Sequence, residues 1–353
     1  MSCKTPAARR PLRYALLLAA LAALLGAAAV AGLALGSVRI PATHVLDIVT
    51  GAAGPGPYRT IVLDVRLPRV LLGAVVGAGL AVIGTVLQAL VRNQLADPFL
   101  LGVSSGASVG AVGVIVLGIG AGAGLATTVT IPLAAFAGAL GSLVLVYGLA
   151  RGGGAMTTGR LVLAGVAVSY ILSALTSLMM VTSARADHLK ETLYWTLGGL
   201  GSARWDMLAL PATVLAVGTA LLITLARPLD LLLVGEEGAT VLGLDTGRFR
   251  AAVFVLASLL TGVLVAFSGA IGFVGLMVPH AARMAVGAGH RRLLPVAALG
   301  GAVFLVLADL AARTVAAPQD IPVGVLTALT GGPFFLWMLR RRPEGGGTEG
   351  APA

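Results

Sequence analysis

The feature that most constrains this chain is a series of apolar runs, each about as long as a bilayer is thick. A helix needs about 20 apolar residues to cross the hydrocarbon core. With 58% hydrophobic and only 11% charged residues, the composition excludes a soluble domain. We therefore predict an all-α, polytopic membrane protein with about ten transmembrane helices in one bundle. The ten runs are residues 14–36, 68–91, 98–118, 128–150, 160–182, 206–226, 248–268, 272–286, 294–312 and 322–340.

The placement of charge predicts the orientation of this bundle. If residues 1–13 form a cytoplasmic tail and all ten runs cross, most of the 24 Lys and Arg residues lie on the inside, as the positive-inside rule expects. The domain then spans 14–340, and 341–353 form a second cytoplasmic tail. The first run is longer than the apolar part of a signal peptide, so we expect it to be retained.

Several functional classes lack their sequence signals. The single cysteine and the four histidines do not show metal-site spacing, so no metal ligands are predicted. The net charge of +10 is spread over loops between helices, which argues against nucleic acid binding. The two lysines, Lys4 and Lys190, follow Cys3 and Leu189, whereas the lysine of a phosphate-binding loop follows a glycine. We therefore expect no cofactor and no ATPase site in this chain.

One intramembrane carboxylate could couple transport to an ion gradient. Asp309 lies within the ninth run, and Arg313 follows four residues later, a spacing that allows the two to pair on a helix. Charges inside a membrane are costly and usually functional, but a paired charge near a helix end can be purely structural. The structural pair is the favoured interpretation, and a proton-coupled carrier is the alternative.

A polar segment, which we call the island, interrupts the apolar sequence between the sixth and seventh runs. Residues 227–245 read RPLDLLLVGEEGATVLGLD, within a predicted cytoplasmic loop at 227–247. Pro228 is expected to end the sixth helix, and Gly235 and Gly243 are expected to divide the segment into two short pieces. Such a piece could fit a groove on a partner ATPase, or it could be a solvated loop. The residue pattern favours neither.

Five motifs, taken together, resemble one known family. They lie in the same order over residues 40–340, and the chain is similar to the membrane subunit of ABC importers for ferric siderophores, haem and cobalamin, the FecCD-type permeases. The resemblance implies a homodimer or close heterodimer around a central pathway, in a bacterial cytoplasmic membrane. It also implies two cytoplasmic ATPase subunits that bind ATP and Mg, an external substrate-binding protein, and most often a ferric siderophore as cargo. The motifs are residues 66–111, which begin RLPRVLLG, the island at 227–245, SGAIGFVGLMVPHAAR at 268–283, HRRLLP at 290–295, and residues 307–335, which begin LADLAARTVAAPQDIPVG.

The resemblance also implies roles for individual residues. In the island, the positions matching the ATPase-contacting helices are Gly235, Glu236, Glu237, Ala239 and Leu242. At the outer side, Arg66 and Arg69 beside Pro68, and Arg313 at the end of the ninth helix, match arginines that meet glutamates of the binding protein. Guanidinium groups suit carboxylates, although simple anchoring at the membrane interface remains an equal alternative for these three.

The pathway and its gate are predicted on the fifth run. Ser169, Ser173 and Thr176 recur on one helical face and could contact polar cargo, or they could simply pack helices together. Thr157 and Thr158 match a polar cytoplasmic gate in the family, although Gly159 stands where Ser or Thr is common. A membrane scaffold without transport is a third and weaker alternative to the importer and the carrier.

Overall fold

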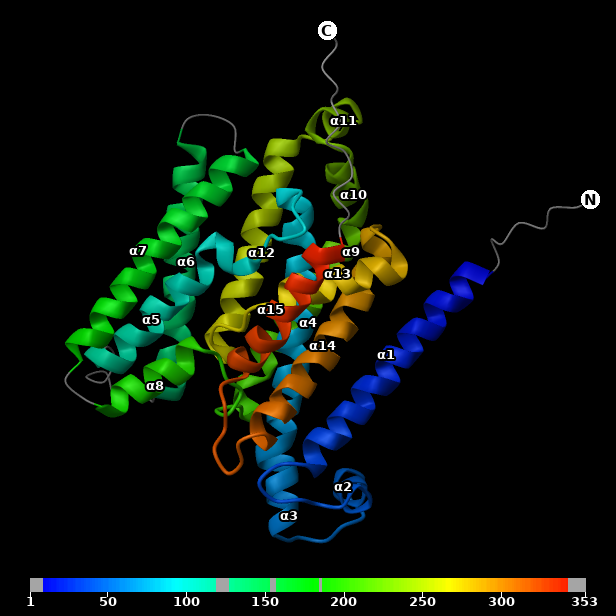
Figure 1. The fold of residues 1–353 in the computed structure, drawn as a ribbon, viewed down its shortest axis with the longest axis vertical. Coiled ribbons are helices and arrows are strands. Elements are labelled where there is room, and N and C mark those ends of the chain that lie inside the picture. Colours follow the sequence, from blue (N-terminus) through cyan, green and yellow to red (C-terminus); the bar gives the residue numbers. More distant parts are fainter. Residues whose placement is uncertain (1–8, 119–126, 153–156, 184–185, 342–353) are drawn as a thin grey trace, which may run out of the picture.

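The computed structural model describes residues 9–118, 127–152, 157–183 and 186–341, and every regular element in these residues is helical (Figure 1). In chain order the elements are α1 (Arg9–Ala34), α2 (Ala42–Val49), α3 (Pro57–Thr60), η2 (Ile61–Arg66), α4 (Leu67–Val91), η3 (Pro98–Leu101), α5 (Val103–Leu117), α6 (Thr127–Arg151), α7 (Thr158–Thr182), α8 (Ala186–Thr196), η5 (Trp205–Met207), α9 (Ala209–Thr224), α10 (Ala226–Val234), α11 (Glu236–Val241), α12 (Thr246–Ser268), α13 (Val274–Val286), α14 (His290–Thr314) and α15 (Val323–Arg341).

Each predicted apolar run coincides with a helix, which confirms the all-α fold class. Within the described residues, seven helical stretches are long and apolar enough to cross a membrane. Three further apolar helices are shorter, at Val103–Leu117, Val274–Val286 and Val323–Met338. The predicted tails lie mostly outside the described residues, but α1 already begins at Arg9, ahead of the predicted start at residue 14.

The short helices follow turns that use part of the apolar run. Before α5, the Asp97 carboxylate accepts a hydrogen bond from the Phe99 N–H at 2.8 Å, and Gly102 has a φ of 74°. Before α13, Phe273 also has a positive φ, 68°. These turns reverse the chain within apolar sequence, so the helices that follow are only 15 and 13 residues long.

The second run begins much earlier than its apolar sequence predicts. One continuous helical stretch runs from Pro57 to Val91, with a wider π-helical part at Ile61–Arg66. The prediction of a start at residue 68 was wrong because charged residues interrupt the apolar run without interrupting the backbone hydrogen bonds. Proline at the first helical position favours the start at Pro57. Arg66 and Arg69 therefore lie inside a helix and not at its end.

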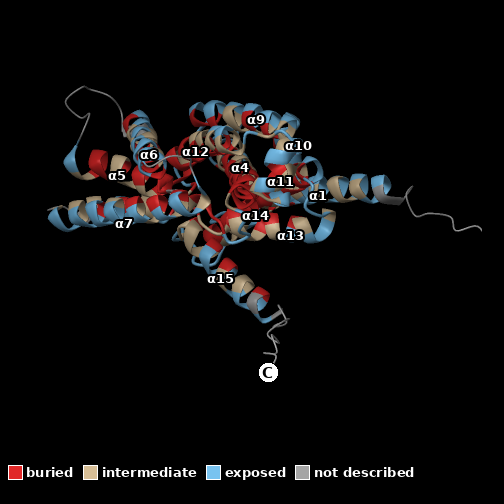
Figure 2. Ribbon diagram, turned by 90° about the horizontal axis from the view of Figure 1, so that it is seen from above, coloured by how far each residue is buried: buried red, intermediate tan, exposed pale blue. Residues whose placement is uncertain are grey.

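The helix α4 is the centre of the bundle. Buried residues gather around α4, α12 and α14 in Figure 2, whereas α1, α7 and α15 are largely exposed. In the most apolar window of each span, 78% of the residues are buried for the stretch that contains α4, against 17% for α1. Exposed apolar side chains on the outer helices are those that lipid or another subunit would cover.

Glycines allow the closest helix contacts, because small residues let two helix backbones approach each other. A β-carbon on Gly77 of α4 would overlap the Gly301 carbonyl oxygen of α14, and the reverse overlap holds for Gly301. The pair α5 and α6 shows the same arrangement at Gly106 and Gly138. At both crossings one backbone rests directly on the other, which fixes α4 against α14 and α5 against α6.

We expect Gly138→Ala to destabilise the protein because the added methyl group must push α6 away from the Gly106 backbone. Overpacking of this kind costs about 1–3 kcal/mol. The control is Gly141→Ala on the same helix, where a β-carbon meets nothing within 4 Å and helix propensity improves by about 0.5–1 kcal/mol. Thermal unfolding in detergent should show a lower midpoint for the first variant only. Equal midpoints would contradict the close contact.

Candidate functional sites

The two ends of the bundle carry different polar clusters. At one end α10 and α11 project beyond the other helices, and at the other lie α2 and α3 (Figure 1). We refer to these as the α11 end and the α2 end. We call residues 226–243, which comprise α10, α11 and the turn that follows them, the elbow.

Glycine forms the joint inside the elbow. The residue between α10 and α11, Gly235, has a φ of 117°, and Gly243 after α11 has a φ of 86°. Side-chain-bearing residues rarely adopt such angles, so both breaks require glycine. The predicted division at these two glycines is therefore present. The break before the elbow differs from the prediction, because α9 ends at Thr224 and Pro228 lies in the first turn of α10.

The elbow exposes an apolar and acidic surface. Val241 is 87% exposed, and Val234, Leu242 and Glu237 are also exposed. Ala239, in contrast, is fully buried and packs α11 onto the body of the bundle. Of the five residues predicted to contact an ATPase, Glu237 and Leu242 thus face outward, and Gly235 shapes the backbone.

The fifth predicted contact, Glu236, is bound within the chain. Its Oε1 accepts a hydrogen bond from Nη2 of Arg250 at 2.6 Å and another from Nη2 of Arg92 at 3.2 Å. Arg92 caps the end of α4 in a left-handed conformation, and Arg250 lies near the start of α12 with its side chain buried. One carboxylate oxygen therefore connects α11 to two transmembrane helices.

A second carboxylate of the elbow, Asp230, contacts α14. Its Oδ1 accepts the backbone N–H of His290 at 2.9 Å and lies 2.6 Å from Nδ1 of the same residue. An ionised carboxylate can only accept, so Nδ1 carries the ring proton. The first amides of a helix have no acceptor within it, and the N-cap of α14, Gly289, has no side chain. Asp230 supplies the missing cap from another helix.

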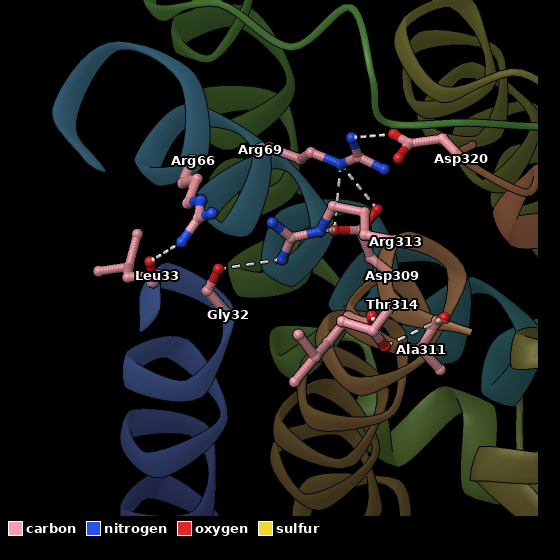
Figure 3. Close-up of polar contacts among 10 residues, drawn as sticks. Gly32, Leu33, Arg66, Arg69, Asp309, Ala311, Arg313, Thr314 and Asp320 are labelled. Carbon is pink, nitrogen blue, oxygen red and sulfur yellow. Dashed lines mark hydrogen bonds and ion pairs between the residues drawn. The ribbon is translucent and has the colours of Figure 1, made fainter. Parts of the chain in front are cut away.

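At the α2 end, two of the predicted docking arginines cap α1 (Figure 3). Arg66 is buried and donates to the Leu33 carbonyl at 2.6 Å and to the Val38 carbonyl at 2.5 Å. Arg313 donates to the Gly32 carbonyl at 3.0 Å. The last carbonyls of a helix lack intrahelical partners, and cations are favourable there. Both guanidinium groups therefore stabilise the end of α1.

The third arginine, Arg69, belongs to an ion-pair network beside this cap (Figure 3). Arg69 Nε donates to Asp309 Oδ1 at 2.9 Å, and its Nη1 donates to Asp320 Oδ2 at 2.6 Å. Arg313 Nε lies 3.1 Å from Asp309 Oδ2, an ion pair that is not aligned as a hydrogen bond. Asp309 is only 2% exposed, whereas the Asp320 side chain is 45% exposed. The predicted pair of Asp309 and Arg313 is present and lies within a larger network.

The hydroxyl residues predicted for the pathway lie along α7 but differ in exposure. Ser169 and Thr176 donate to carbonyls of their own helix, at 2.8 and 3.0 Å. Ser173 is exposed, and its oxygen lies 3.5 Å from that of Ser105 on α5. Thr157 caps α7 by accepting the Arg160 N–H at 3.5 Å, and Thr158 is the first residue of that helix. Only part of the hydroxyl stripe is therefore open.

Sequence reasoning missed the partners of these residues. Arg250 follows the island by only a few positions, and His290 lies in the motif HRRLLP. Arg92 and Asp320 lie far along the chain from the residues they contact. No spacing rule links them, and only the packing of α4 against its neighbours brings them together.

Comparison with known proteins identifies relatives over almost the whole chain. A family model described as the FecCD transport family matches residues 21–341. The cobalamin import system permease protein BtuC of Halobacterium salinarum is 47% identical over 82% of this chain and 75% of its own. The hemin transport system permease protein HmuU of Yersinia pestis is 43% identical over 80% and 84%. A solved structure titled as an inward-facing metal-chelate type ABC transporter aligns with a TM-score of 0.80 at 32% identity, covering 93% of this chain and all of its own.

We expect Asp309→Asn to destabilise the protein strongly because two guanidinium groups lose a buried partner. Removing one member of a buried ion pair costs about 3–5 kcal/mol. Asp320→Asn is the matched control, since its pair is half-exposed and such pairs contribute about 0–1 kcal/mol. Chemical or thermal unfolding in detergent measures both. Similar losses in the two variants would contradict the larger contribution of the buried carboxylate.

Proposed function

The chain belongs to the FecCD transport family of ABC importer permeases, and we propose that it moves a metal chelate into the cytoplasm by alternating access driven by separate ATPase subunits. The observation that carries this proposal is the elbow. It presents exposed Val241, Leu242 and Glu237 on a short helix that is tied to the transmembrane body by Glu236. A short, firmly held helix with an apolar face suits a groove on a moving partner.

The proposed ATPase subunits contact the α11 end, and ATP and Mg are held there by those subunits. Helix α1 begins and α15 ends in the half of the bundle that carries α11 (Figure 1). Together with the positive-inside bias, this supports a cytoplasmic location for the elbow and for both termini in a bacterial cytoplasmic membrane. The same orientation turns the α2 end outward.

The proposed binding protein docks at the α2 end. The network there pairs two arginines with two carboxylates, and Arg66 beside it binds only carbonyls, so the cap and the network together keep one excess positive charge that favours an acidic partner. Because all three arginines already have acceptors within the chain, glutamates of a binding protein would have to exchange with those acceptors or approach from the rim. We therefore propose docking to the charged surface as a whole.

A second permease subunit is proposed to cover the exposed face of α7. Tyr170 and Ile171 are among its exposed side chains, and Ser173 and Ser177 are exposed hydroxyl residues of the same helix. An apolar face that also carries hydroxyl groups suits a pathway between two subunits better than lipid alone. Thr157 and Thr158 then lie at the cytoplasmic end of that pathway and form the proposed gate.

The proposed cargo is a metal bound by its own chelator. A ferric siderophore was expected from the resemblance, with haem or cobalamin as the alternative, and two relatives are named for cobalamin and hemin. Among the described residues, no group of three or more His, Cys, Asp or Glu could hold a metal ion. We propose that the cargo arrives already chelated and that the binding protein sets selectivity.

We expect uptake into proteoliposomes to require ATP, the ATPase subunit and the binding protein together. A ferric siderophore, haem and cyanocobalamin are to be supplied separately, and the accumulated chelate is measured by its metal content. Uptake of one of them with ATP supports the proposal. Uptake by the permease alone under a pH gradient would overturn it in favour of the carrier alternative.

We expect Val241→Asp to weaken binding of the ATPase subunit, because a charge replaces an apolar contact on the elbow. Desolvating one unpaired carboxylate at an interface costs about 2 kcal/mol or more, which corresponds to at least about thirtyfold in Kd. Val38→Asp makes the same change on an exposed residue at the α2 end and serves as the control. Equal affinities for the two variants in a pull-down titration would place the ATPase elsewhere.

A further inference from the structure

The elbow is attached to the bundle by two partly exposed carboxylates, and the residues they bind belong to three different helices. Asp230 of α10 binds the first residue of α14, and Glu236 of α11 binds α4 and α12. Their main partners are buried: the side chain of His290 is only 1% exposed and that of Arg250 only 3%. The two carboxylates lie on either side of Gly235, the joint between the two short helices.

The contact of Asp230 with His290 is directional. Both the backbone N–H and the ring Nδ1 of His290 point to the same carboxylate oxygen. Because this oxygen caps the first turn of α14, a shift of α10 must either pull that turn along or leave a helix amide without an acceptor. Leaving a buried amide unpaired is costly, so movement of the two helices together is favoured.

The contact of Glu236 is likewise shared. Its Oε1 lies between two guanidinium groups that approach from the end of α4 and from the start of α12. Charge-assisted hydrogen bonds of this kind are short and strong. A shift of α11 therefore acts on two further helices through a single oxygen atom.

The helices held in this way reach the opposite end of the bundle. Helix α4 carries Arg69, and α14 carries Asp309 and Arg313, so both contribute to the ion-pair network at the α2 end. The two helices are also in backbone contact at Gly77 and Gly301. A displacement at the elbow thus acts directly on the pair of helices that form the other charged site.

We propose that Asp230 and Glu236 are positioning residues that transmit movement of the elbow to α14, α4 and α12. This inference rests on the proposed function. It assigns the residues that bind the bundle, Asp230 and Glu236, to transmission, and the exposed residues of the elbow to contact with the ATPase. Glu237 is the natural comparison: it is the next residue on the same helix, is exposed, and faces outward. The two neighbouring glutamates therefore have different tasks.

The experiment compares Glu236→Gln, Asp230→Asn and Glu237→Gln in the complete transporter in proteoliposomes. Chelate taken up per ATP hydrolysed, Kd for the ATPase subunit and thermal stability are measured for each. We expect Glu236→Gln and Asp230→Asn to lower uptake per ATP by about tenfold or more, as the loss of a hydrogen bond to a charged group predicts. Their Kd should stay within about twofold of the wild-type value, which is below 1 kcal/mol. Glu237→Gln should show the opposite pattern, a weaker Kd with unchanged uptake per ATP.

Two further variants separate transmission from general stability. Arg92→Gln removes an exposed partner of Glu236 and should reproduce part of the loss in uptake per ATP without lowering the unfolding midpoint. The double variant of Asp230→Asn with His290→Ala should show no lower uptake per ATP than the more severe single variant, since both substitutions disrupt the same contact between residues 230 and 290. Full additivity of the two would overturn the assignment of Asp230.

The outcomes distinguish this inference from the proposed function. Absence of ATP-driven uptake by the wild-type complex would count against the proposed function itself. Normal wild-type uptake, combined with wild-type uptake per ATP in both Glu236→Gln and Asp230→Asn, would overturn the transmission role alone. A fall in uptake per ATP that merely followed a lower unfolding midpoint across all variants would also overturn it.

Discussion

The backbone contact between α4 and α14 at Gly77 and Gly301 is the constraint on which the rest of the structure depends. In lipid there is no hydrophobic force between helices, so close van der Waals packing must hold them together. Small residues permit that packing, and they allow α4 to lie at the centre of the bundle with neighbours on every side. Once α4 and α14 are fixed together, the charged residues near their ends are brought to fixed positions as well.

The charges near the ends of these helices are paired because they cannot remain alone at the border of a membrane. At the α2 end, guanidinium groups meet both carboxylates and the free carbonyls of α1. At the α11 end, carboxylates meet guanidinium groups and a free helix amide. The same physical need, satisfying the polar ends of helices, has produced cationic caps on one side and anionic caps on the other. The bundle is therefore polarised along its axis.

Much of the fold could be predicted from the sequence, because a helix that crosses a membrane consists of a continuous run of apolar residues. All ten runs are helices, and the glycines that divide the elbow were recognisable from their spacing. The start of the second helical stretch at Pro57 was not predictable from hydropathy, since Asp64 and Arg66 interrupt the apolar run while the helix continues. Local composition reports the environment of a helix more reliably than its ends.

The site was only half predictable for a related reason. The elbow and the three arginines could be named from sequence, but their internal partners are separated from them by up to 281 residues. A glutamate that faces a partner and one that faces the bundle look identical in sequence, and Glu236 and Glu237 differ only in the direction imposed by α11. Their contacts decide their chemistry: Glu236 is paired with two cations of its own chain, while Glu237 is exposed. Under the proposed function, the first glutamate holds the elbow to the membrane helices and the second contacts the ATPase.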